Sequence, residues 1–165
     1  MQSKQNGVGM VEVLVALILL AIAVLGFVGL QIRAVAASHE AGRNVQAMNI
    51  ARDLSERIRV NRDGLLHYEE SDSDENCGSG ASGVFCTSEE MANYDFNEVN
   101  KNANALGMQI AINDCQGTAA LSRKCIYVAW EGTTPTNGVG SPNCTNGVAY
   151  VPEAKCIIVE VYNYD

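Results

Sequence analysis

The feature that most constrains this chain is an apolar stretch near its start. Residues 13–30 are uncharged and mostly apolar, without a proline, and within residues 10–30 the only ionisable side chain is that of Glu12. A helix of this length can cross a bilayer. In a chain of 165 residues, this pattern predicts one membrane-length helix and one domain of ordinary size.

The charge is divided between two regions of the chain. Residues 33–62 carry six arginines against three carboxylates, a net charge of +3, whereas residues 63–165 carry four basic against fifteen acidic residues, a net charge of −11. Such an acidic domain disfavours tight binding to nucleic acid phosphates. We therefore expect an acidic, exposed head with no nucleic acid partner.

All cysteines follow the apolar stretch, and their even number and position predict three disulfides in the periplasm or outside the cell. Six cysteines permit fifteen connectivities, of which sequential pairing is the simplest expectation. The expected pairs are Cys77–Cys86, Cys115–Cys125 and Cys144–Cys156. A metal site is disfavoured, because no pair has C-x2-C spacing and both His39 and His67 lie far from any cysteine.

The N-terminus fits neither of two simpler interpretations fully. The apolar run is too long for a cleaved signal peptide and has no A-x-A site after it. A plain signal anchor, with Lys4 in the cytoplasm and the acidic domain outside, fits better. It leaves Glu12 unexplained, since an unpaired carboxylate in an apolar segment costs about 2–3 kcal/mol or more.

The order Lys4, Gly7, Val8 and Glu12, followed by unbroken apolar residues, resembles the class III prepilin signal of the type IV pilin-like family. The resemblance implies cleavage by a prepilin peptidase after Gly7 and N-methylation of the new first residue, Val8, where many pilins have Phe. It also implies that Glu12 pairs with the amino terminus of a neighbouring subunit during assembly. Two charges that are each unfavourable in apolar surroundings become tolerable together.

The rest of the chain predicts an α+β fold. The N-terminal helix is expected to continue to about residue 62 as one rod, with Gly64 as its left-handed cap and an apolar stripe that packs on the head. That stripe comprises Val45, Met48, Ala51, Leu54 and Ile58. A capping box at residues 87–90 predicts a second, shorter helix. Residues 108–111, 125–130, 148–151 and 156–162 read as strands of a small antiparallel sheet.

The expected organisation follows the pilin-like pattern, with one long helix on a small disulfide-bonded head. Residues 1–7 would be the leader peptide, residues 8–31 the transmembrane and fibre-core helix, residues 32–63 its amphipathic continuation, and residues 64–165 the globular head. Gly26 and Gly29 lie near the C-terminal end of the apolar stretch. They would allow either local unwinding of the helix in the fibre or close packing of neighbouring helices.

Residues 12–31, together with scattered pieces such as residues 91–96 and 127–130, are similar to the PilV group of minor pilins. That likeness implies a subunit held in the inner membrane with its head in the periplasm, and later in the pilus fibre or at its tip. It would enter in small numbers with other major and minor pilins, prime assembly and carry a PilY-type adhesin, in support of adhesion and twitching motility.

Two alternatives compete with this interpretation. A minor pseudopilin of type II secretion is similar in the same N-terminal residues. A membrane-anchored periplasmic enzyme is disfavoured, because the paired carboxylates at residues 69–70 and 89–90 and the two histidines form no catalytic pattern and imply no cofactor. An acidic run at residues 72–76 has the beginning of a calcium loop, but Cys77 and Gly83 stand where that loop needs Gly and Glu.

Overall fold

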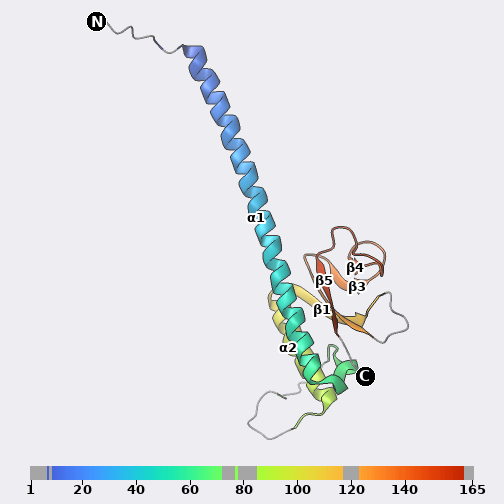
Figure 1. Cartoon of the computed structure of the whole chain (residues 1–165). Helices are drawn as coiled ribbons and strands as arrows, with labels where there is room; N and C mark the ends of the chain where they lie inside the picture. Colours follow the sequence, from blue (N-terminus) through green and yellow to red (C-terminus); the bar gives the residue numbers. More distant parts are fainter. Residues whose placement is uncertain (1–6, 8, 72–76, 78–84, 117–122, 162–165) are drawn as a thin grey trace. The chain divides into compact units, whose positions relative to one another are not determined.

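The computed structural model describes residues 7, 9–71, 77, 85–116 and 123–161 (Figure 1). The elements in chain order are α1 (Met10–Val60), the 3-10 helix η1 (Arg62–His67), α2 (Ser88–Ala105), β1 (Met108–Asp114), β2 (Lys124–Trp130), β3 (Thr134–Asn137), β4 (Asn143–Thr145) and β5 (Cys156–Val161). The chain divides into two compact units, Met1–Gly42 and Arg43–Asp165. The second unit is called the head below.

The first unit consists of the N-terminal part of α1. Its described side chains are exposed, apart from the half-buried Glu40. The helix continues through Gly26 and Gly29, and at both positions a Cβ atom would meet nothing within 4 Å. The expectation of one helix of about fifty residues is confirmed, since α1 has 51.

The C-terminal part of α1 contributes one face to the core of the head. Its buried residues are Ala47, Ile50, Ala51, Leu54 and Ile58. The expected stripe is therefore right for the last three of these and wrong for Val45 and Met48, which are 61% and 43% exposed. At 3.6 residues per turn, positions 45 and 48 lie about 100° or more from the centre of the buried face.

The expected left-handed cap at Gly64 is wrong. The first helix ends at Val60, η1 follows, and the backbone at Gly64 does not have a positive φ. Gly64 is buried, and a Cβ atom there would collide with the carbonyl oxygen of Ser88 and the side chain of Asn61. A glycine at this position allows η1 to approach the first turn of α2 closely.

The second helix has the ends that its sequence predicts. Glu90 donates its backbone N–H to Thr87 Oγ1 at 3.3 Å, and Thr87 donates its own to Glu90 Oε2 at 2.7 Å, which completes the capping box. These hydrogen bonds with Thr87 lower the pKa of Glu90. At the other end Gly107 has a φ of +70°, and Arg43 Nη1 donates to the carbonyl of Leu106 at 2.6 Å.

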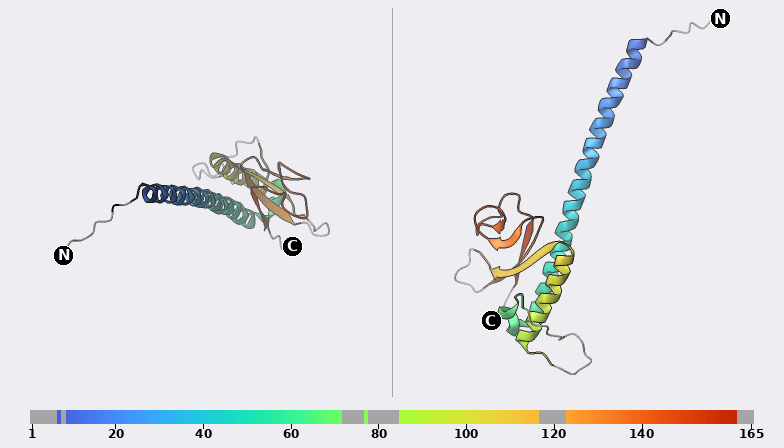
Figure 2. Two further views of the ribbon diagram at one scale, coloured as in Figure 1. Left: turned by 90° about the horizontal axis from the view of Figure 1, so that it is seen from above. Right: turned by 180° about the vertical axis from the view of Figure 1, so that it is seen from behind.

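The three-stranded sheet has the order β1-β2-β5 with antiparallel neighbours (Figure 2). Along the central strand, β2, side chains alternate between the two faces. Ile126, Val128 and Trp130 belong to the main core, which includes residues of α1 and α2. Cys125, Tyr127 and Ala129 form a second cluster with Cys144 and Cys156. The sheet is therefore covered on both faces.

The strand expected at residues 148–151 is wrong. Asn146 Oδ1 accepts the backbone N–H groups of Val148 and Ala149, both at 3.0 Å, so this segment is a side-chain-stabilised turn. Its one ladder contact is an isolated bridge between Thr145 and Tyr150. The short parallel pairing of β3 with β4 was also not predicted from the sequence.

The structure joins the cysteines in sequence order, with the pairs Cys77–Cys86, Cys115–Cys125 and Cys144–Cys156. The two cysteines of these pairs are 9, 10 and 12 residues apart in the sequence, so each disulfide closes a short loop. The second bond connects the end of β1 to β2, and the third connects β4 to β5. No free cysteine remains.

Candidate functional site

Glu12 lies in the first turn of α1. Its backbone N–H donates to the carbonyl of Gly9 at 3.0 Å, and its side chain is exposed. A carboxylate here interacts favourably with the positive end of the helix dipole. Glu12 has no ion-pair partner among the described residues. Gly7 is exposed and precedes the helix, and Val8 lies outside the described residues.

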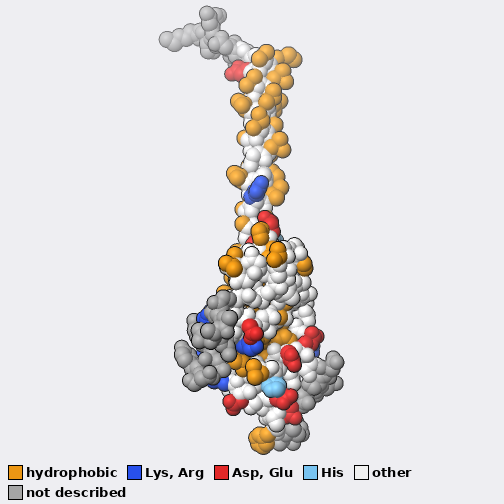
Figure 3. Space-filling model, turned by 90° about the vertical axis from the view of Figure 1, so that its right-hand side faces the viewer, with side chains coloured by type: hydrophobic (Ala, Val, Ile, Leu, Met, Phe, Trp, Pro, Cys, Tyr) orange, Lys and Arg blue, Asp and Glu red, His pale blue; other side chains and the backbone are white. Residues whose placement is uncertain are grey.

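Beyond Glu12, residues 13–30 of the helix display mostly apolar side chains, which are orange in Figure 3. The exposed fractions of the first unit's large hydrophobic side chains run from 42% at Val28 to 87% at Met10. The helix is long and apolar enough to cross a membrane, and no part of its most apolar 18-residue stretch is buried in the protein. A soluble monomer rarely exposes so much contiguous apolar surface. This segment therefore requires cover from lipid or from other helices.

A polar network joins α1 to the rest of the head. Arg57 Nη1 donates to Asp95 Oδ1 at 2.6 Å, and Arg57 Nε donates to Asp53 Oδ1 at 3.1 Å. The hydroxyl of Tyr68 donates to the other oxygen of Asp95 at 3.3 Å. Residues from α1, α2 and the segment after η1 thus meet at one carboxylate. Asp53 and Arg57 have the i, i+4 spacing of a helical ion pair. Tyr68 and Asp95 lie too far along the chain for the sequence alone to connect them to that pair.

The network perturbs the titration of two of its members. Burial, followed by the nearby charge of Asp95, raises the pKa of Tyr68 to about 12. Burial is also the largest effect on Arg57 and lowers its pKa, but the hydrogen bonds and charges of Asp95 and Asp53 together raise it above its usual value. Both side chains therefore hold their protons throughout the physiological pH range, which suits a structural role.

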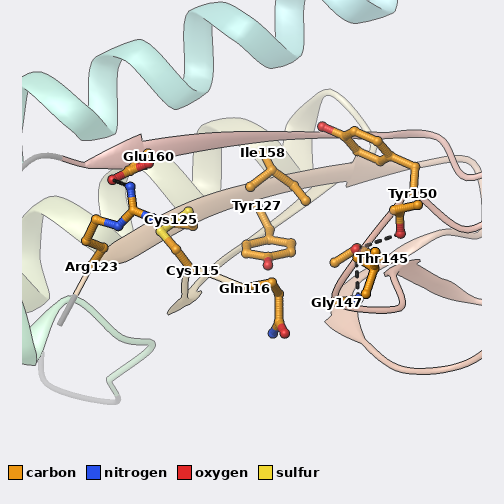
Figure 4. Close-up of a pocket in the computed structure, with 12 residues that line it drawn as sticks. Cys115, Gln116, Arg123, Cys125, Tyr127, Thr145, Gly147, Tyr150, Ile158 and Glu160 are labelled. Carbon is orange, nitrogen blue, oxygen red and sulfur yellow. Dashed lines mark hydrogen bonds and ion pairs between the residues drawn. A yellow bond between two sulfur atoms is a disulfide. The ribbon is translucent and has the colours of Figure 1, made fainter. Parts of the chain in front are cut away.

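A surface groove of about 260 Å³ lies on the face of the sheet away from α1 and α2 (Figure 4). Tyr127 and Ile158 line it from the sheet, and Gly147 and Tyr150 line it from the turn that follows β4. At one end Arg123 Nη1 and Glu160 Oε1 form an ion pair at 2.6 Å. The groove is smaller than most small-molecule sites, which occupy roughly 300–1,000 Å³. The two charges of this pair neutralise each other, although Arg123 Nε is buried without a hydrogen-bond partner in the described part of the chain.

Of the remaining residues considered in the sequence, the structure brings His67 and Glu89 together as an exposed pair. His67 Nδ1 lies 3.5 Å from Glu89 Oε1 on the surface, and both side chains are substantially exposed. Within the described ranges no three His, Cys, Asp or Glu residues gather in a way that could hold a metal ion. The acidic run at residues 72–76, which begins like a calcium loop, lies outside those ranges.

Two family matches adjoin along the chain. Residues 2–28 match the prokaryotic N-terminal methylation motif, and residues 29–97 match the family of type IV pilin Tt1218. No curated protein and no solved structure matches the chain.

The methylation motif leads into an exposed apolar helix, and a small disulfide-bonded sheet follows later in the chain. This combination defines a pilin-like subunit. The chain belongs to the type IV pilin-like family, whose members are structural proteins rather than enzymes. Membership implies processing by a prepilin peptidase and assembly with other pilins. The signal and the apolar helix fit membrane anchoring followed by assembly into a pilus. Neither match is specific to the PilV group.

Proposed function

We propose that this chain is a minor pilin of the PilV type, which enters a type IV pilus in small numbers and helps to prime its assembly. The observation that carries the proposal is the carboxylate of Glu12, exposed and without an ion-pair partner among the described residues, at the start of an uncovered apolar helix. A cationic N-terminus from a neighbouring subunit would neutralise this carboxylate in apolar surroundings. The adjacent helices would cover the apolar surface.

In this proposal the peptidase cuts after Gly7, and Val8 becomes the methylated first residue. Residues 8–31 then form the membrane and fibre-core helix, residues 32–63 its continuation and residues 64–165 the head. The amino terminus starts in the cytoplasm and the head in the periplasm, an orientation supported by Lys4 and by the three disulfides, which need an oxidising compartment. A PilY-type adhesin at the fibre tip would be the cargo.

The first experiment is peptide mass spectrometry on surface fibres sheared from cells that produce the full chain. We expect peptides of this chain in the fibres, with an N-terminus at Val8 and a mass increase of one methyl group on it. Processed protein confined to the membrane would favour a pseudopilin of type II secretion. An uncut Met1 form in cells with active peptidase would refute the proposal.

The role of Glu12 needs a separate experiment. Glu12→Gln removes the charge and keeps the size of the side chain, so we expect normal cleavage and strongly reduced incorporation into fibres. Leu14→Met is the matched control, because it lies on the same apolar helix and conserves its character. Equal incorporation of the two variants would show that the carboxylate has no part in assembly.

A further inference from the structure

Three large hydrophobic side chains are exposed where α1, η1 and α2 meet. Val60 is 87% exposed, Leu66 is 76% exposed and Phe85 is 97% exposed. Asn61 Nδ2 donates to the carbonyl of Ser88 at 2.7 Å, which holds the end of α1 against the start of α2. The three residues therefore lie at the same end of the head. We call this end, with the acidic residues described next, the η1 surface.

Acidic side chains, red in Figure 3, gather toward this end of the head. Asp63, Glu69 and Glu70 are exposed and have no ion-pair partner in the described part of the chain. Glu89 adds a fourth carboxylate, close to His67. Against these stands Arg62, which is also exposed. The η1 surface is thus apolar with a net negative rim.

The η1 surface rests on a fixed base. Leu65 and Tyr68 are buried directly beneath it at 8% and 4% exposure, and Gly64 packs against Ser88. The hydrogen bond of Tyr68 to Asp95 ties the segment after η1 to α2. Leu65 faces the core while its neighbour Leu66 faces solvent. Leu66 is thus held on a packed segment with its side chain exposed, where it is available for contact with a partner.

A partner for this surface would combine apolar and basic side chains. The chain itself carries a surface of that chemistry. Val45, Met48 and Arg52 are spaced i, i+3 and i+7 on α1, which places them on one face of the helix, opposite the buried face. All three are exposed, and Arg52 has no ion-pair partner in the described ranges. We call these three residues the outer α1 face.

We propose that the η1 surface docks on the outer α1 face of a neighbouring pilin-like subunit, with apolar residues in contact and carboxylates facing arginine. This inference rests on the proposed function as a fibre subunit. Because the two surfaces differ, the contact is heterologous, so one subunit uses its η1 surface and its neighbour uses its outer α1 face. Charge complementarity would set the register of the two subunits.

The test is site-specific photocrosslinking of the full chain in cells that make fibres. The photoreactive residue p-benzoylphenylalanine replaces Leu66 in one variant and Val139 in the control. Val139 is 94% exposed but lies between β3 and β4, outside the η1 surface. We expect an adduct from position 66 to a pilin-like chain, attached to the helix just after its apolar segment, and at least about fivefold less from position 139.

Charge reversal tests the rim independently. Glu69→Lys combined with Glu70→Lys should lower the yield of the position-66 adduct about fivefold, because attraction to the basic face becomes repulsion. The matched control is Glu131→Lys combined with Glu153→Lys, which changes two exposed carboxylates elsewhere on the head by the same charge. Here we expect an unchanged yield.

Equal adducts from positions 66 and 139, an adduct to an adhesin or another protein without a prepilin signal, or equal yields in the two charge-reversal variants would overturn the inference. Adducts are measured in whole cells, whereas the proposed function is judged from the N-terminus and from the presence of the chain in sheared fibres. A processed chain in fibres without the position-66 adduct would refute the docking surface alone. An unprocessed chain would refute the proposed function.

Discussion

Removing the carboxylate of Asp95 should destabilise the head more than removing an exposed carboxylate does. Asp95 is 8% exposed, and it accepts hydrogen bonds from Arg57 at 2.6 Å and from Tyr68 at 3.3 Å. Breaking a fully buried ion pair costs about 3–5 kcal/mol, and breaking an exposed one costs about 0–1 kcal/mol. With the Arg57 side chain 32% exposed, we place the loss of this pair at about 1.5–2 kcal/mol.

The hydroxyl of Tyr68 adds a second cost. Tyr68 is 4% exposed, and a buried donor without an acceptor costs about 1–3 kcal/mol. Asp95→Ala should therefore lower the free energy of unfolding by about 3 kcal/mol. Asp95→Asn keeps an acceptor oxygen and loses only the charge, so its cost should be about half as large.

The assay is urea unfolding of the full chain in mild detergent with the disulfides intact. Fluorescence is a suitable signal, because Trp130 is the single tryptophan and is 2% exposed in the core of the head. The control is Asp114→Ala, which removes an ion pair of similar length, 2.7 Å to Lys124, from an aspartate side chain that is 81% exposed. That change should cost less than about 0.5–1 kcal/mol. Equal losses for the Asp95 and Asp114 variants would refute the reasoning.

Three further outcomes follow from the head. Gly64→Ala should destabilise the head by about 2–3 kcal/mol, because the new methyl group collides with Ser88. The control Gly42→Ala, on an open face of α1, should leave the free energy of unfolding unchanged or slightly raise the helix content measured by circular dichroism. Since the pKa of Tyr68 is raised from 10 to about 12, its contribution to stability should be complete below pH 10 and lost as the pH rises toward 12; urea midpoints measured across this range should fall less steeply in Tyr68→Phe. Thr87→Ala should cost about 1 kcal/mol in the same unfolding assay, through loss of the N-cap, and a loss below about 0.3 kcal/mol would contradict that role.

The elements that the sequence predicted correctly are those encoded by neighbouring residues. The capping box of α2 needs only Thr87 and Glu90, three positions apart, and it formed as expected. The apolar stripe of α1 was partly wrong because Val45 and Met48 also fit helical spacing, and only packing against α2 and the sheet selects the face that is buried. The segment at residues 148–151 has the composition of a strand, but the side chain of Asn146 accepts the backbone N–H groups of Val148 and Ala149, which a strand would need for its ladder.

The candidate functional site could also be predicted from the sequence only in part. The segment from Gly7 to Glu12 and the apolar helix are contiguous, so their order alone indicated a pilin-like subunit. The η1 surface could not be predicted in that way. Leu65 and Leu66 are identical in type and adjacent in the chain, yet one is 8% and the other 76% exposed. Only the position of η1 against α2 distinguishes them.

The positions of the disulfides have a mechanical consequence. All six cysteines lie outside α1 and α2, and each bond closes a loop of the head on itself. None of the three disulfides links α1 to the rest of the head. In a fibre under tension, force between α1 and the rest of the head would be resisted by side-chain packing and by the ion pair between Arg57 and Asp95. The hydrogen bonds of Arg43 to Leu106 and of Asn61 to Ser88 would add to this resistance. Loss of these contacts would separate α1 from the rest of the head, while the three disulfide-closed loops would remain covalently intact.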